Sequence, residues 1–198
     1  MRIGILAIQG DVREHARHVS RAGGDPVLVR RVDDLAKTDG LIIPGGESTT
    51  IGMLMDEYGL LTAIRALAQD NRYPIYGTCA GLILLAKEVV GPSPARLGLV
   101  DITADRNAYG RQIASFEALM DIPVLGEEPF PAVFIRAPKI TRLGDGVKPL
   151  ATYQGTVVMA EEGPYLVSSF HPEMSEDIRV HQYFLEKVAR TAKVQSAS

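Results

Sequence analysis

Four short apolar runs constrain the fold of this chain more than any other feature. They span residues 2–8 (RIGILAI), 26–30 (PVLVR), 40–46 (GLIIPGG) and 73–78 (YPIYGT), and polar residues do not alternate along them. Such runs are typical of strands that are covered on both faces. Segments with helical character separate them, so the order of elements predicts a parallel sheet with helices on both faces.

Helical character is found in residues 11–24, which end in two glycines, in residues 49–70, interrupted near Gly59, and in residues 80–89. Beyond Gly98 the pattern changes to shorter β-like pieces with turn residues between them. We therefore expect a three-layer, flavodoxin-like α/β fold whose sheet is mostly parallel with some antiparallel strands.

The end of the chain predicts a hairpin around residues 162–164 and a closing helix over residues 176–192. No linker, repeat or low-complexity tract divides the sequence. We expect one domain over residues 1–198, with residues 192–198 as a frayed tail.

Composition excludes several classes of function. A net charge of −3 over 198 residues argues against a nucleic-acid partner, whose binding surface is normally basic. No apolar stretch approaches the roughly 20 residues of a membrane span. The apolar start lacks a small-residue cleavage site, so a buried first strand explains it better than a signal peptide. A single cysteine forms no internal disulfide and no multi-cysteine zinc site, which favours a cytoplasmic protein without a metal.

That cysteine lies in the pattern Gly77-Thr78-Cys79-Ala80-Gly81, between an expected strand and an expected helix. A tight strand-to-helix turn with small neighbours raises a nucleophile above the carboxyl edge of a sheet. The helix start stabilises a thiolate and offers free N–H groups to a developing oxyanion. The alternative is a small buried thiol in an ordinary turn. The turn alone does not separate these two interpretations.

A thiol nucleophile needs a histidine within hydrogen-bond reach and a third group that orients the ring. We expect His15 and His18, in a charged helix, to face solvent, and His181 lies among polar residues of the last helix. His171 differs because it follows an apolar strand and precedes Pro172 and Glu173. Alone, His-Pro-Glu is more often a helix-entry loop.

A second glycine turn, PGGEST, ends the third apolar run. Consecutive glycines let backbone N–H groups approach a ligand closely. We therefore assign the N–H groups of Gly46 and Ala80 to an oxyanion hole. The alternative is an ordinary turn in which Ser48 caps the next helix. A phosphate site is disfavoured because the lysine of a P-loop is absent.

Together, PGGEST, YGTCAGLILLA and SSFHPE resemble the class I (triad) glutamine amidotransferases, in order over nearly the whole chain. The stretches GILAIQGDVREH, GGESTTIGML and DRNAYGRQIASFEA resemble more closely the glutaminase subunits of pyridoxal 5′-phosphate synthase. The resemblance implies hydrolysis of L-glutamine to L-glutamate and ammonia through a cysteine thioester, without a cofactor.

The resemblance also implies a role for each matching residue. Cys79 would be the nucleophile, His171 the acid and base, and Glu173 the group that orients His171. Contacts to L-glutamine would come from Gly46, Glu47, Ser48, Arg106, Ile135 and Arg136. A fixed arginine suits the substrate α-carboxylate, although for each of the two arginines a surface ion pair is the simpler interpretation from sequence.

The implied protein partner is the synthase subunit, which receives the ammonia and belongs to a large ring-shaped assembly. Gln9, Gly10 and Asp11 would lie near that interface; alternatively they form a turn with Asp11 as a helix cap.

Two other functions stay open. One is a glutaminase that serves another synthase, of histidine or purine biosynthesis. The other is a non-enzymatic flavodoxin-like redox or stress protein, which leaves His171-Pro172-Glu173 unexplained. Serine hydrolase chemistry is excluded because the turn carries cysteine.

Overall fold

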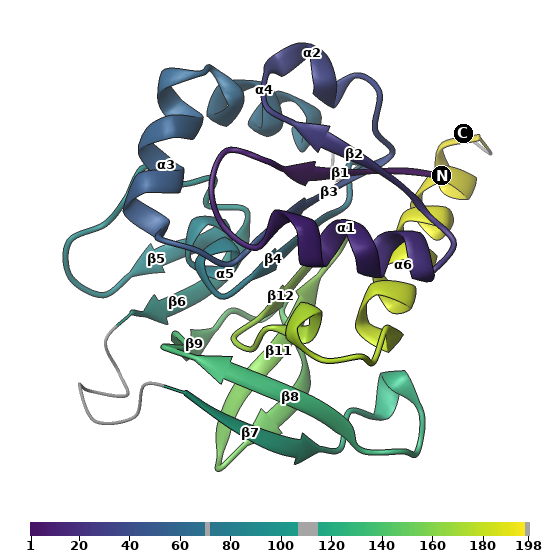
Figure 1. Cartoon of the computed structure of the whole chain (residues 1–198). Helices are drawn as coiled ribbons and strands as arrows, with labels where there is room; N and C mark the ends of the chain where they lie inside the picture. Colours follow the sequence, from purple (N-terminus) through teal and green to yellow (C-terminus); the bar gives the residue numbers. More distant parts are fainter. Residues whose placement is uncertain (70–71, 107–114, 197–198) are drawn as a thin grey trace.

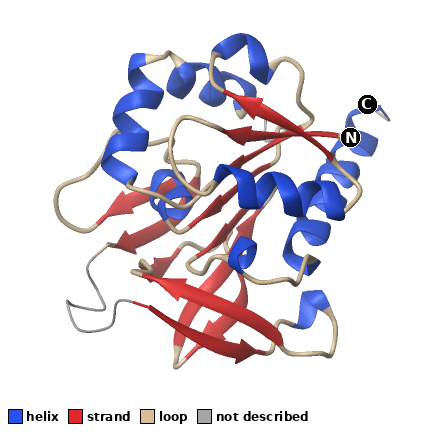
Figure 2. Cartoon of the chain, in the orientation of Figure 1, coloured by secondary structure: helices blue, strands red, loops and turns tan. Residues whose placement is uncertain are grey.

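The computed structural model describes residues 1–69, 72–106 and 115–196. In this part of the chain a seven-stranded sheet has the order β10-β11-β12-β4-β3-β1-β2 (Figures 1 and 2). Strands β2, β1, β3, β4 and β12 are parallel to one another, and β11 and β10 continue the sheet antiparallel. The strands are β1 (Arg2–Leu6), β2 (Asp25–Val29), β3 (Gly40–Ile43), β4 (Ile75–Thr78), β10 (Lys148–Tyr153), β11 (Thr156–Glu162) and β12 (Tyr165–Ser168).

The two faces of this sheet bury two separate apolar cores. Along β3, Leu41 and Ile43 point into one core and Ile42 into the other, because successive side chains of a strand alternate. One face is covered by α3 (Ser48–Glu57), α4 (Leu60–Leu67) and α5 (Ala80–Leu85), and the other by α1 (Val12–Arg21) and α6 (Arg179–Ser196). Helix α2 (Val32–Leu35) is a single turn that packs beside β2. The three-layer fold expected from the sequence is confirmed.

Two helical predictions differ in outcome. The interruption near Gly59 is confirmed: Gly59 has φ 70°, a left-handed conformation that favours glycine, and separates α3 from α4. The helix expected over residues 80–89 is too long. It ends at Leu85, and Ala86–Val89 form strand β5, which pairs with β6 (Val100–Asp105).

Smaller sheets account for the middle of the chain. Strand β6 also pairs with β9 (Lys139–Leu143), and β7 (Ser115–Met120) forms a hairpin with β8 (Phe130–Ile135). In β8 the buried side chains alternate, and Phe130, Ala132 and Phe134 join the core beneath α6. The 3₁₀ turns are η2 (Pro123–Leu125) and η3 (Pro172–Met174). The hairpin expected around residues 162–164 is confirmed as β11–β12.

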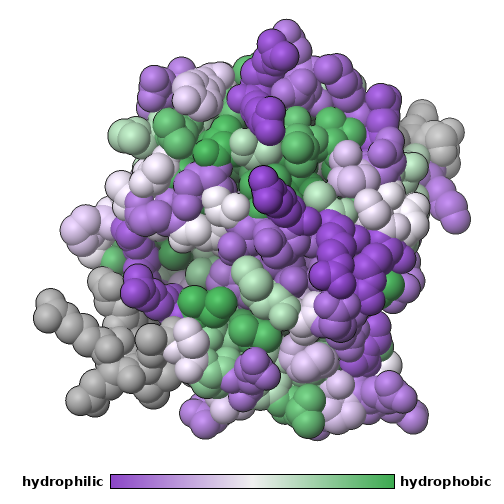
Figure 3. Space-filling model, in the orientation of Figure 1, coloured by the Kyte–Doolittle hydropathy of each residue, from purple (hydrophilic) through white to green (hydrophobic). Residues whose placement is uncertain are grey.

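The last helix, α6, begins at Arg179 and runs to Ser196, four positions past its expected end. Hydrophilic residues gather over α1 and the start of α6 in the space-filling view (Figure 3). On α1 these are exposed residues such as Arg13, Arg17 and Arg21. Among the described helices, none combines the length and the apolar character that crossing a membrane requires.

Candidate active site

Cys79 occupies the turn that joins β4 to α5, as the glycine-flanked pattern predicts. Its φ of 48° and ψ of −98° are strained for a residue other than glycine. Two backbone hydrogen bonds hold the turn: the Cys79 N–H donates to Ser168 O at 2.9 Å, and Ile83 N–H donates to Cys79 O at 3.3 Å. The strain is therefore imposed by the elements on both sides of the turn, and such strain is concentrated at functional sites.

The glycines beside Cys79 are required by close packing. A Cβ on Gly77 would meet the carbonyl group of Gly81, and a Cβ on Gly81 would meet the carbonyl of Ile43. Helix α5 therefore begins directly against β3 and β4, where a side chain has no room.

His171 and Glu173 lie at the same edge of the sheet as Cys79. Strand β12 is parallel to β4, with Ser168 opposite Thr78, so the chain leaves both strands at their carboxyl ends. His171 Nδ1 is 2.8 Å from Glu173 Oε1, and both residues are 3% exposed. Glu173 turns back toward the ring from η3, which places it where the resemblance implies an orienting group.

Burial alone would lower the pKa of His171, but contacts with Asp11, Cys79 and Glu173 outweigh it and raise that pKa to about 12. The imidazolium form is therefore favoured. Burial alone would raise the pKa of Glu173, but its contacts with His15 and His171 hold that pKa well below its ordinary value. Glu173 is thus a buried carboxylate beside His171.

The thiol of Cys79 donates to the carbonyl oxygen of Ile135 at 3.8 Å, across the site on β8. His171 Nε2, the ring nitrogen turned away from Glu173, has no hydrogen-bond partner within the described residues. Cys79 is close enough to raise the pKa of His171, yet the two groups form no short hydrogen bond. Loose contacts of this kind are common before a substrate binds.

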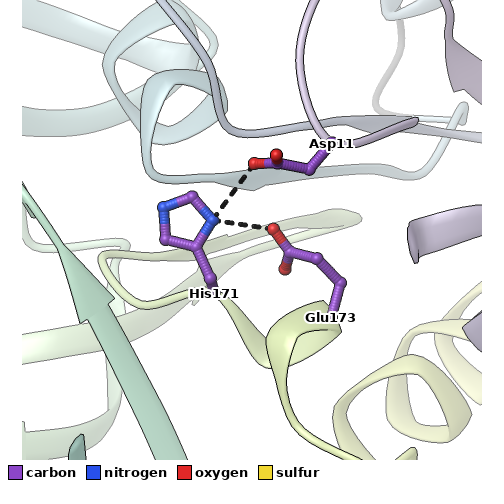
Figure 4. Close-up of side chains that lie close together, drawn as sticks. All are labelled: Asp11, His171 and Glu173. Carbon is purple, nitrogen blue, oxygen red and sulfur yellow. Dashed lines mark hydrogen bonds and ion pairs between the residues drawn. The ribbon is translucent and has the colours of Figure 1, made fainter. Parts of the chain in front are cut away.

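Asp11 approaches the same nitrogen of His171 from the other side. Its Oδ2 lies 3.4 Å from Nδ1, so two carboxylates converge on one imidazole (Figure 4). Asp11 is the N-cap residue of α1, but its side chain makes no capping hydrogen bond. A Cβ on Gly45 would meet both the His171 ring and the Asp11 carboxylate, so only glycine allows this approach.

Ligand atoms of Asp11, His171 and Glu173 lie within 4.8 Å of one another, close enough to hold a cation. The nitrogen that would bind it already donates to Glu173 at 2.8 Å. A metal there would have to replace that proton, so hydrogen bonding accounts for the cluster more simply.

The loop between β3 and α3 borders the site. Glu47, not Ser48, caps α3: its carboxylate accepts from the N–H groups of Thr49 and Thr50 at 3.0 and 2.7 Å. Burial tends to raise the pKa of Glu47, but these hydrogen bonds outweigh it and lower the pKa to about 2. The Gln9 side chain accepts from Glu47 N–H at 2.9 Å and so ties the loop to the first strand.

These groups surround one cavity of about 430 Å³, within the range of roughly 300–1,000 Å³ typical of small-molecule sites. Its wall brings together most of the residues expected to bind substrate or act on it. The lining residues are Asp11, Gly46, Glu47, Ser48, Cys79, Ala80, Ile83, Arg106, Ile135, Arg136, His171 and Met174. Gln9, Gly10 and Glu173 do not line it.

The two arginines differ. Arg106 lines the cavity and donates to Glu47 Oε1 at 3.3 Å and to Thr49 Oγ1 at 3.2 Å, so it is both a wall residue and an ion-pair partner. Arg136 is exposed and has φ 44°, which turns the chain sharply after Ile135. Residues 107–114 of the stretch DRNAYGRQIASFEA lie outside the described residues.

The expectation that His15 and His18 face solvent is wrong. Both are buried with His181, at 0–1% exposure. The missed signal is their spacing: His15, His18, Val19 and Ala22 fall at i, i+3, i+4 and i+7 of one helical face. The contact of Asp11 with His171 was also missed, because it joins positions far apart in sequence.

Comparison with known proteins identifies the family of this chain. The family model described as SNO glutamine amidotransferase family matches residues 5–190. A pyridoxal 5′-phosphate synthase subunit PdxT from Pelotomaculum thermopropionicum is 51% identical over 193 residues, covering 98% of each chain. The same-named subunit of Moorella thermoacetica is 50% identical over 188 residues, covering 95% of this chain and all of its own.

A crystal structure of a glutamine amidotransferase superposes with a TM-score of 0.89 at 47% identity, covering 94% of this chain and 98% of the other. The chain belongs to the SNO glutamine amidotransferase family. The family resemblance stated from the sequence motifs is thereby confirmed.

Proposed function

We propose that this protein is a glutaminase that hydrolyses L-glutamine to L-glutamate and ammonia and delivers the ammonia to a pyridoxal 5′-phosphate synthase subunit. The observation that carries the proposal is that Cys79 and His171 line one cavity, with Glu173 holding the far nitrogen of the His171 ring. The relatives at about half identity, named as pyridoxal 5′-phosphate synthase subunits, support the choice of synthase.

In the acylation step, the proton of Cys79 Sγ passes to His171 Nε2 to form the thiolate–imidazolium pair that the raised pKa of His171 favours, and the thiolate attacks the side-chain carbonyl carbon of glutamine. Nε2 is the ring nitrogen available for this proton transfer, because Nδ1 is held by Glu173. The imidazolium then protonates the leaving nitrogen, the C–N bond breaks, and ammonia leaves a γ-glutamyl thioester on Cys79.

In the second step, His171 takes a proton from water, and the resulting hydroxide attacks the thioester carbonyl. The C–S bond breaks, the sulfur recovers its proton through His171, and glutamate leaves. Glu173 stabilises the imidazolium and holds the tautomer in both steps. The N–H groups of Gly46 and Ala80, which both border the cavity, are proposed to hold the oxyanion.

Substrate recognition is assigned to the remaining wall. Arg106 is the cation proposed for the α-carboxylate, since it lies in the wall with its guanidinium already oriented by Glu47 and Thr49. Contacts from both ends of the cavity would fix the glutamine between the β3–α3 loop and the turn after β8. The full set proposed is Gly46, Glu47, Ser48, Arg106, Ile135 and Arg136.

The partner is proposed to contact the turn formed by Gln9, Gly10 and Asp11. This turn contacts groups of the site: the Gln9 side chain accepts from Glu47 N–H, and Asp11 Oδ2 lies 3.4 Å from His171 Nδ1. A protein that docks there can therefore influence both the β3–α3 loop, which carries the Gly46 N–H proposed for the oxyanion hole, and the imidazole of His171. A ring-shaped assembly, a cytoplasmic location and a single domain over residues 1–198 complete the proposal; no cofactor or metal takes part.

The proposal is tested by measuring glutamate release from glutamine by the purified chain, with and without a pyridoxal 5′-phosphate synthase subunit, in parallel with Cys79→Ala. Release that rises with the partner and is lost in Cys79→Ala supports it. Added chelator is expected to leave the rate unchanged.

Release that a histidine or purine synthase raises, but this synthase does not, would move the chain to another pathway. No release under any of these conditions would overturn the glutaminase assignment and favour a buried or redox-sensing thiol.

A further inference from the structure

A buried polar cluster lies directly behind Glu173, on the side away from the cavity. His15 comes from α1, His181 from α6 and Thr78 from the end of β4, and all three are 0% exposed. Burying polar groups is unfavourable unless they are paired, so such a cluster needs a reason. The proposed mechanism does not use any of these residues.

The contacts of His15 connect this cluster to the carboxylate. Its Nε2 lies 3.4 Å from Glu173 Oε2 and 3.2 Å from Thr78 Oγ1. The other oxygen of Glu173 holds His171. Two imidazoles therefore flank one carboxylate, each on its own oxygen. No hydrogen bond reaches Oε2 within the described residues, and His15 Nε2 faces that oxygen at 3.4 Å.

The second nitrogen of His15 fixes the direction of donation. His15 Nδ1 is 2.9 Å from His181 Nε2, while His181 Nδ1 has no partner in the described part of the chain. Orphaned buried N–H groups are rare, so the proton of His181 belongs on Nε2, where it is donated to His15. Burial is the main cause that lowers the pKa of His181 and keeps this residue neutral. With its Nδ1 accepting from His181, His15 carries a proton on Nε2, the nitrogen that lies 3.4 Å from Glu173 Oε2.

We infer that His15 is a positioning residue for the proposed glutaminase reaction: its Nε2–H holds the free oxygen of Glu173, so that the other oxygen stays on His171 Nδ1. The line of donors runs from His181 through His15 to Glu173, and from His171 to the same carboxylate. Without His15 the carboxylate is free to rotate about its buried side chain. His171 would then lose the partner that keeps Nε2 toward the thiol.

The inference rests on the proposed function, and its test uses a pair of variants that separate the two ring nitrogens. The amide of His15→Asn replaces the Nδ1 side and cannot donate from the Nε2 position, whereas the amide of His15→Gln reaches that position. His18→Asn is the matched control: His18 is buried one turn later on α1, and within the described residues its nitrogens hydrogen-bond to the backbone carbonyls of Glu14 and Ser175.

In the presence of the synthase subunit, His15→Asn is expected to lower kcat by roughly 10–100-fold, as removal of an outer orienting group does in metal sites, with KM for glutamine within about twofold. His15→Gln is expected to recover most of the loss, and His18→Asn to keep kcat near the wild-type value. Equal kcat for His15→Asn and wild type, or equal loss in the Asn and Gln variants, would overturn the inference.

Two further measurements keep the test decisive. Alkylation of Cys79 by iodoacetamide needs no substrate and is expected to slow severalfold in His15→Asn and not in His15→Gln, so it decides the inference even if wild type releases no glutamate. If His15→Asn does not fold, ¹⁵N NMR of histidine-labelled wild type replaces it. A protonated His15 Nε2 supports the inference, and an unprotonated one overturns it.

Discussion

His171 Nδ1 donates to Glu173 Oε1 over 2.8 Å, between two side chains that are two positions apart and almost fully buried. A proline and a single 3₁₀ turn bring the carboxylate back to the ring. The pair fixes the orientation of the imidazole before any substrate arrives. The proposed chemistry depends on this orientation, because only Nε2 remains free to exchange a proton with Cys79.

The charge of Glu173 is expected to matter more than its shape. Glu173→Gln keeps the volume but lets an amide replace the carboxylate, so the favoured tautomer of His171 is lost. We expect kcat for glutamate release to fall by roughly 10²–10⁴-fold, as in triads that lose the orienting carboxylate. Steady-state kinetics of the complex with the synthase subunit measure this.

Glu176→Gln is the control for that substitution. Glu176 lies three residues further on, and its exposed side chain pairs with Arg17 and Arg21. Exposed pairs contribute about 1 kcal/mol or less, so kcat should stay near the wild-type value. Equal losses in the two variants would contradict the role assigned to Glu173.

The site also depends on the absence of a side chain at Gly45. In Gly45→Ala the new Cβ would meet the His171 ring and the Asp11 carboxylate. We expect the free energy of unfolding to fall by about 1–3 kcal/mol, as in overpacked cores, together with a loss of glutamate release. Gly146→Ala is the control, because its Cβ would meet only the flexible end of Glu162. If Gly45→Ala is as stable and active as Gly146→Ala, Gly45 does not pack closely against His171 and Asp11.

The His171–Glu173 pair predicts how stability depends on pH. Because the pKa of Glu173 is lowered on folding, its contribution is present above about pH 4.5 and is lost as the pH falls below that value. Because the pKa of His171 is raised from 6.5 to about 12, its contribution is full below pH 6.5 and is lost as the pH rises toward 12. The pair therefore stabilises the fold most between about pH 4.5, above which Glu173 contributes, and pH 6.5, below which the contribution of His171 is full.

Urea unfolding over a range of pH measures this dependence. Each proton contributes a slope of at most about 1.4 kcal/mol per pH unit. Glu173→Gln should flatten the acid side of the profile and His171→Gln the alkaline side. Profiles that run parallel to the wild type in both variants would contradict the shifts.

Arg106 is expected to act through substrate binding. Arg106→Gln removes the cation proposed for the glutamine α-carboxylate, and hydrogen bonds to charged groups contribute about 1.5–3 kcal/mol. KM for glutamine should therefore rise by roughly 10–100-fold, with a smaller change in kcat. Arg142→Gln is the control, since Arg142 pairs with Asp101 and Glu88 and does not line the cavity. An unchanged KM in Arg106→Gln would leave Arg106 as the partner of Glu47 only.

The sequence predicts the central sheet and the catalytic edge well for a physical reason. Continuous apolar runs such as residues 40–43 show a strand buried on both faces, and parallel strands bring their carboxyl ends to one edge. Cys79 and His171 each follow such a strand, so the sequence alone predicts that they lie close together. The His171–Glu173 contact is local and follows from the intervening proline.

Other features could not be obtained in this way, because they depend on contacts between distant segments. His15 reads as a polar residue of a charged helix, yet tertiary packing buries it against His181 and Glu173. Asp11 reads as a helix cap, yet its carboxylate turns to His171. Residues 86–89 (AKEV) read as the end of the helix that begins at residue 80, but pairing with β6 makes them a strand.

The central claim is that Cys79 carries a γ-glutamyl thioester during turnover. Intact-mass analysis of the acid-quenched complex, taken during turnover with glutamine, tests it directly. The account predicts an added mass of one γ-glutamyl group on wild type and no adduct in Cys79→Ala. In His171→Gln the adduct accumulates only if acylation still occurs, because His171 acts in both acylation and hydrolysis. Glutamate release that persists in Cys79→Ala, with no adduct on wild type at any time, would contradict it.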